Sequence, residues 1–318
     1  MIRCDDWRHF PSSAIEPLLQ HERDAWLREL HWDVRSAWQG VEPARRAGTL
    51  PGFVARSADG TPLGWTSFLL HRDTVQVLAF VAADAPTADA LVDAILDSAE
   101  RATVGAVLFC VRTASDALPH ALAARGFRVE PYRYLSADLT PRVPAFGGLR
   151  PWAGDGDRLG RLLAGAYERE TTTRAFAPGG TAPEWTEYVA ALLTTTGCGR
   201  FAPGLSFVAP SSQTGAIAGA VIVTELSSRT SHIAQIAVAP GDRGRGLGGQ
   251  LVFAAMAAAA SAGHARMTLL VAASNRSAIG LYERAGFTDR SSFTVAMAGP
   301  DALSAPPALA TVTSAVAL

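Results

Sequence analysis

Apolar residues recur along the chain with two spacings: about 3.6 residues, which indicates amphipathic helices, and two residues, which indicates strands. In the second half, these spacings predict helices over 157–168 and 183–193 and strands over 205–209, 216–226 and 231–238. They then predict a helix over 247–262, a strand over 266–271, a helix over 275–284 and a last strand near 293–297.

The first half follows a similar order of elements. Its pattern predicts strands over 52–56, 63–70 and 74–82, a helix over 87–101, a strand over 106–111 and a closing helix over 117–125. Both halves therefore combine several strands with helices, which indicates an α/β fold.

Short sequences recur at a separation of about 160 residues. Residues 122–127 resemble 282–287, since both segments end in Gly-Phe, and the offset between them is 160. Upstream, residues 78–81 align with 235–238 at an offset of 157. The second copy therefore has three extra residues between these points, and we place them in a glycine-rich turn.

A repeat of this length indicates two copies of one domain, because the units of repeat proteins are much shorter. The proline- and glycine-rich stretch 141–148 separates the copies. We therefore expect one domain over 1–142, a second over 148–299, and a proline- and alanine-rich tail of low complexity over 300–318.

Composition narrows the classes of partner. The chain has 28 Lys+Arg against 29 Asp+Glu, so no net field attracts nucleic acid or an anionic membrane, and all its cations are arginines because lysine is absent. No apolar run approaches the roughly 18 residues needed to span a bilayer. Three separated cysteines without a C-x-x-C spacing argue against a disulfide framework and a metal site. We expect a cytoplasmic protein that binds neither nucleic acid nor membrane.

One segment, 235–251, carries candidate chemistry. It runs from an apolar strand into a turn with glycines and arginines and then into a helix. Unpaired main-chain N–H groups and the positive end of a helix dipole make such a junction suitable for a diphosphate. Gly244-x-Gly246-x-x-Gly249 also matches a dinucleotide fingerprint. That hypothesis needs an acidic residue about 20 positions further on, where the chain has only 270–274, Leu-Val-Ala-Ala-Ser.

Two motifs occur together in the second copy. Arg243-Gly-Arg-Gly-Leu-Gly248 follows the strand, and Asn275 opens a later helix that carries Tyr282 before Gly286-Phe287. With both motifs, this copy resembles the GNAT family of acyl-CoA-dependent N-acyltransferases. The resemblance implies two tandem GNAT-like domains, each with a mixed, mostly antiparallel central sheet flanked by helices.

The first copy lacks the phosphate-binding features. Its corresponding stretch, 82–90, has two carboxylates and neither glycine nor arginine, and Leu122 and Ser115 stand in place of Tyr282 and Asn275. By analogy with tandem proteins that resemble mycothiol synthases, we expect this copy to be catalytically silent.

The resemblance assigns roles to residues of the second copy. Acetyl-CoA, or another acyl-CoA, is the implied co-substrate, with no metal, and a main-chain N–H of the strand could polarise the thioester carbonyl. Tyr282 is the implied general acid or hydrogen-bond donor for the departing thiolate, and a core tyrosine is its alternative role. The residues expected to bind the cofactor are Ile236, Ala237, Val238, Arg243, Gly244, Arg245, Gly246, Leu247, Gly248, Gly249, Asn275 and Ser277.

Attack on a thioester requires a neutral amine, so an ammonium substrate must lose a proton to a base or to water. His232 is the first candidate, because an imidazole titrates near neutrality and strand alternation places it on one face with Ala234 and Ile236. Glu225, acting through a water, is the second candidate.

The expected reaction is direct transfer of acetyl to a primary amine of a small molecule, without a covalent intermediate, by a monomer or homodimer. The alternative is an acyl-CoA-binding sensor or scaffold without turnover.

Overall fold

The computed structural model describes residues 2–71, 73–98, 100–140, 147–168, 173, 176–195, 197–211 and 216–299. The expected tail 300–318 and most of the expected boundary stretch, 141–146, lie outside these residues. The chain forms two compact units, each with its own core. Unit 1 comprises Met1–Leu18, Val41–Pro131 and Phe293–Leu318, and unit 2 comprises Leu19–Gly40 and Tyr132–Ser292.

The first elements in chain order are β1 (Arg3–Asp6), η1 (Trp7–His9), α1 (Ser12–Leu30), α2 (Val41–Arg46), β2 (Gly52–Arg56), β3 (Pro62–His71), β4 (Thr74–Ala82), α3 (Ala85–Leu96), η2 (Arg101–Thr103), β5 (Ala106–Thr113), α4 (Ala117–Ala124) and β6 (Arg128–Asp138). The second series is β7 (Arg150–Pro151), α5 (Gly156–Ala166), α6 (Ala182–Thr194), β8 (Arg200–Phe201), η4 (Pro203–Leu205), β9 (Phe207–Pro210), β10 (Ile217–Ser227), β11 (Thr230–Val238), η5 (Pro240–Asp242), α7 (Leu247–Ser261), β12 (Arg266–Ala272), α8 (Arg276–Arg284) and β13 (Thr288–Ala298).

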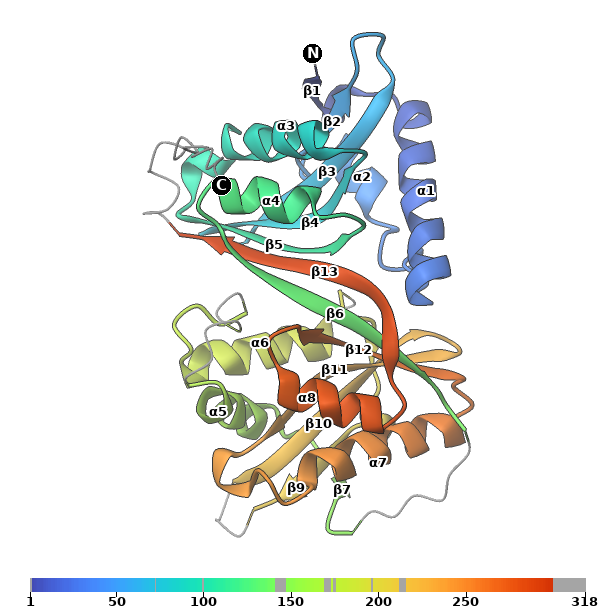
Figure 1. The fold of residues 1–318 in the computed structure, drawn as a ribbon, viewed down its shortest axis with the longest axis vertical. Helices are drawn as coiled ribbons and strands as arrows, with labels where there is room; N and C mark the ends of the chain where they lie inside the picture. The colour runs from blue at the N-terminus through green and yellow to red at the C-terminus, as the bar shows by residue number, and fades with distance from the viewer. Residues whose placement is uncertain are drawn as a thin grey trace, which may run out of the picture. The chain divides into compact units, whose positions relative to one another are not determined.

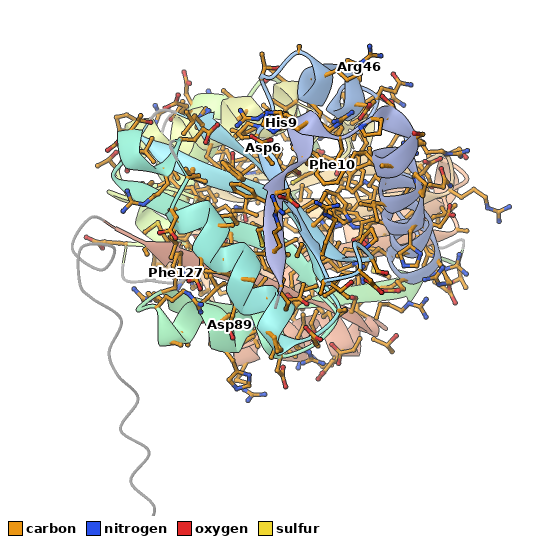
Figure 2. All side chains as sticks on the ribbon, turned by 90° about the horizontal axis from the view of Figure 1, so that it is seen from above. Asp6, His9, Phe10, Arg46, Asp89 and Phe127 are labelled. Carbon is orange, nitrogen blue, oxygen red and sulfur yellow. The ribbon has the colours of Figure 1, made fainter. Side chains whose placement is uncertain are left out.

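In unit 1, the strands follow the order β1-β2-β3-β4-β5-β13, and α3 and α4 lie together on one face of this sheet (Figure 1). Leu91, Phe109 and Leu122 are fully buried between the helices and the strands. Arg125, which follows α4, donates to Asp93 at 2.6 Å and to Asp89, labelled in Figure 2, at 2.7 Å. These ion pairs join the end of α4 to α3.

In unit 2, the order is β6-β12-β11-β10-β9-β7, with β8 paired to β10. The β11–β12 pair is parallel, and the pairs β6–β12, β10–β11 and β9–β10 are antiparallel. Helices α7 and α8 pack with one core cluster, and α5 and α6 with another (Figure 1). Unit 2 therefore has three layers, with the sheet between two pairs of helices.

Each unit includes a strand from the opposite half of the sequence. β6 belongs to the first copy by sequence, yet Tyr132 to Asp138 pair with β12 in unit 2. β13 belongs to the second copy, yet Ala296 and Ala298 are buried in the unit 1 core. The Thr294 hydroxyl lies 2.6 Å from that of Thr113 on β5. The two copies have exchanged their last strands.

The elements predicted over 52–125 and 157–297 agree with the structure to within five residues at each end. The structure also has β1, α1, α2, β6, β7 and β8, which were not predicted. The register also corrects the repeat. Equivalent residues of the parallel pairs are 156 apart on β4 and β11 and 160 apart on β5 and β12. The second copy therefore has four extra residues, where three were predicted. The whole segment between the two paired strands is 83–105 in unit 1 and 239–265 in unit 2, which differ by four residues. Within it, the connection from strand to helix is 83–84 in unit 1 and 239–246 in unit 2.

Within the described ranges, every helix is too short or too polar to cross a lipid bilayer.

Candidate active site

β11 and β12 separate along their length. Their parallel pairing runs from Thr230↔Arg266 to Ile233↔Leu269, although β11 continues to Val238 and β12 to Ala272. Beyond Ile233, the edge of β11 that faces β12 has no strand partner in the described structure. Main-chain N–H and C=O groups at an open edge can bind an extended ligand that contains amides.

A β-bulge lies at the point of separation. Gln235 pairs with Ile222 and Ile233 with Val223, so Ala234 is the extra residue on β11. The bulge shifts the alternation by one residue, because Ile233 and Ile236 both pack on the side of α7 and α8. The prediction that His232 and Ile236 share one face is therefore wrong.

The glycine turn leads into α7, whose first main-chain N–H groups have no hydrogen-bond acceptor in the described part of the chain. Gly244 and Gly246 have φ of +78° and +80°, a region that favours glycine. Gly246 is the N-cap of α7, and no side chain caps this helix. The N–H groups of Leu247, Gly248 and Gly249 have no acceptor among the described residues. Three main-chain donors and the positive end of a helix dipole thus face an uncovered position, as an anion site requires.

The corresponding helix of unit 1 is already capped. Asp84 is the N-cap of α3, and its carboxylate accepts the N–H of Thr87 at 2.9 Å. Pro86 in the same turn has no N–H. A carboxylate of the chain itself thus stands at the helix N-terminus in unit 1, where a phosphate would meet repulsion.

Of the two arginines in the turn, Arg243 is held by main-chain carbonyls. Its Nη2 donates to Ala166 at the end of α5 at 2.7 Å, and its Nε donates to Val238 at 3.3 Å. Arg245 is 73% exposed and lies 3.4 Å from Asp242. Arg243 therefore joins α5 to the turn, and Arg245 is the more accessible charge.

Asn275 and Ser277 lie at the start of α8. The Asn275 side chain accepts the N–H of Ala278 at 3.1 Å, so Asn275 is the N-cap of the helix, and Ser277 is exposed in the first turn.

Tyr282, on α8, is 5% exposed and packs edge-on against Phe287. Burial, and to a lesser extent the nearby Tyr167, raises the pKa of the Tyr282 phenol. The hydroxyl therefore keeps its proton at neutral pH and can act as a donor.

Tyr167, which caps the end of α5, was not identified from the sequence. Its hydroxyl donates to Gln235 Oε1 at 3.1 Å and lies 3.2 Å from the carbonyl oxygen of Ile236. No motif marks Tyr167, and only its position at the end of the predicted helix 157–168 could have pointed to it.

His232 lies in an apolar environment. Its Nδ1 is 2.9 Å from the Thr268 hydroxyl, and its ring contacts those of Trp32 and Tyr134, with centroids 5.9 and 6.0 Å away. Burial lowers the pKa of His232 to about 4. The expectation that this imidazole titrates near neutrality is therefore wrong, because desolvation disfavours the charged form.

Glu225, at the end of β10, forms an ion pair with Arg200, and its Oε1 lies 3.4 Å from Nε2 of His264. Its carboxylate is thus paired with the Arg200 guanidinium and lies beside the His264 ring.

Among known proteins, residues 168–287 match the Acetyltransferase (GNAT) family. This segment is a GNAT domain. None of the curated proteins matches the chain. The GNAT domain contains the bulge, the glycine turn and α8, and its family supports acyl-CoA-dependent acyltransfer in general.

Solved structures show the same fold at low identity. A GCN5-related N-acetyltransferase from Sphaerobacter thermophilus has a TM-score of 0.52 and 18% identity, covering 78% of this chain and 80% of its own. A tandem GNAT protein from the clavulanic acid biosynthesis pathway has a TM-score of 0.52 and 17% identity, covering 79% and 83%. A Drosophila protein has a TM-score of 0.56 and 13% identity, covering 94% and 99%. The predicted tandem GNAT fold is confirmed.

Proposed function

We propose that the chain is an N-acyltransferase that transfers acetyl from acetyl-CoA directly to a primary amine of a small molecule. The observation that carries the proposal is the uncapped N-terminus of α7 beside the open edge of β11, in contrast to the capped α3 of unit 1.

The cofactor would bind along these two features. The diphosphate accepts hydrogen bonds from the N–H groups of Leu247, Gly248 and Gly249. Arg245 adds a positive charge beside it, and Arg243 holds the turn in place. The pantetheine amides pair with the edge from Ile236 to Val238, as an added strand would. Two residues beyond the bulge, the Ile236 N–H donates to the thioester carbonyl and stabilises the charge that develops on its oxygen.

In the reaction, the amine nitrogen attacks the thioester carbon and the C–S bond breaks. The leaving thiolate takes the proton of the Tyr282 hydroxyl, and the amine gives its proton to a base. That proton then passes from the base to the Tyr282 oxygen, which restores both groups for the next turnover. His232 is the first candidate for that base and Glu225, through a water, the second. With a pKa of about 4, His232 is unprotonated at neutral pH but holds a transferred proton only weakly.

The test measures CoA release from acetyl-CoA with a panel of small amines, together with acetyl-CoA affinity. We expect amine-dependent release in the wild type. In Tyr282→Phe, kcat should fall by about 100-fold or more with little change in acetyl-CoA affinity, because only the donor is lost. Tight binding of acetyl-CoA without amine-dependent release would instead favour the sensor or scaffold.

A further inference from the structure

The main chain of Ile236, two residues beyond the bulge, is contacted by the side chains of Gln235 and Tyr167. The Ile236 N–H donates to the side-chain Oε1 of its own neighbour, Gln235, at 2.9 Å. The Tyr167 hydroxyl reaches the same oxygen at 3.1 Å and the carbonyl oxygen of Ile236 at 3.2 Å. Strand pairing with β12 has already ended at Ile233, so these groups lie on the open edge of β11. The position that the proposed function gives to the thioester carbonyl is therefore occupied by the Gln235 amide oxygen.

The Gln235 amide is held on one side only. Its oxygen accepts two hydrogen bonds, and its Nε2 has no acceptor in the described part of the chain. A hydroxyl has one proton, so Tyr167 cannot donate fully to Gln235 and Ile236 at once. The side chain of Gln235 is thus a removable acceptor and not part of the fixed strand ladder.

We propose, on the basis of the proposed function, that Gln235 determines specificity between acyl-CoA and free CoA, and that Tyr167 positions it. The Gln235 oxygen satisfies the Ile236 N–H in the free protein. The carbonyl of an acyl-CoA replaces that oxygen as acceptor, one hydrogen bond for another. The thiol of CoA is a weak acceptor and leaves Gln235 in place. The exchange weakens acyl-CoA binding and assists the departure of CoA, because Gln235 returns to the N–H.

Three substitutions test the exchange. Gln235→Met keeps a side chain of similar length but removes the acceptor, so the half-buried N–H is unsatisfied until an acyl carbonyl binds. We expect the ratio of the CoA Kd to the acetyl-CoA Kd to rise roughly tenfold. Tyr167→Phe removes only the hydroxyl that holds Gln235, so the ratio should rise by a smaller factor. Gln235→Glu retains acceptor oxygens and should leave the ratio at or below the wild-type value.

The experiment is calorimetric titration of the full chain and these variants with acetyl-CoA and with CoA. Both ligands are measured on one preparation, so the ratio does not depend on the folded fraction. A ratio that rises in the order Gln235→Glu, wild type, Tyr167→Phe, Gln235→Met supports the proposal. An unchanged ratio, or a lower one in Gln235→Met, overturns it while leaving the proposed function intact. Binding of neither ligand by the wild type would contradict the proposed function and this proposal together.

Discussion

His232 is a buried imidazole whose pKa is set by side chains that lie far from it in the sequence. Asn275 and the turn glycines are recognised from neighbours in sequence, and the structure shows the N-cap and positive φ values that these residue types favour. The rings around His232 come from Trp32 and Tyr134, about 200 and 100 positions upstream. A sequence pattern cannot give such long-range burial, and burial decides the pKa.

The buried His232 makes stability depend on pH. Its pKa is lowered from 6.5 to about 4, so the unfolded chain binds more protons between these values. The contribution is complete above pH 6.5 and is lost as pH falls toward 4, a loss of about 3 kcal/mol. Denaturant unfolding at several pH values should show this loss in the wild type, and His232→Gln should lack it. Equal pH dependence in both proteins would contradict the burial of His232.

At the scale of elements, the sequence predicted most helices and strands because their periodicity is local, although it predicted neither α1 nor α2. It did not predict β6, in which Pro131 interrupts the apolar pattern, nor the bulge at Ala234, which depends on pairing with β10. The sequence predicted a glycine-rich turn between β11 and α7. The structure shows that backbone conformation explains Gly244 and Gly246, because a Cβ at either would meet no atom within 4 Å.

Alanine substitutions at the junction of the turn with α7 test this explanation. Gly246→Ala places a side chain at φ +80° and should lower the free energy of unfolding by about 1 kcal/mol. Gly248→Ala is the matched control, since Gly248 lies inside α7 and its Cβ would make an ordinary 3.4 Å contact with Leu281. It should be neutral or slightly stabilising. Equal destabilisation of both variants in denaturant unfolding would argue against the conformational explanation.

At the scale of the whole molecule, the repeat indicates two copies, yet neither core is built from one copy alone. Unit 1 uses β13 from Phe293 onward, and unit 2 uses β6 from Tyr132 onward. Local periodicity identifies strands but not the sheet edge on which they pair. The exchange of the last strands could therefore not be predicted from the sequence. The boundaries 1–142 and 148–299 stay a prediction about the copies of the repeat.

The exchange predicts that the copies fold together. Residues 1–142 and 148–299, expressed separately, should each lack cooperative unfolding, because each would leave one sheet without its exchanged strand. Co-expression should restore a stable complex. As a control, a protease site inserted near 144 should allow cleavage of the folded chain without loss of structure. A monomeric, cooperatively folded fragment would contradict this account.

The proposed function requires coenzyme A to bind at the uncapped α7 and not at the capped α3. Calorimetric titration of the full chain with CoA tests it most directly, beside Gly248→Asp, which adds a carboxylate to the first turn of α7, and Asp84→Asn, which removes the charge at α3. We expect one CoA per chain, affinity lowered by at least about tenfold in Gly248→Asp, and no change in Asp84→Asn. Two CoA molecules per chain, or undiminished binding by Gly248→Asp, would contradict it.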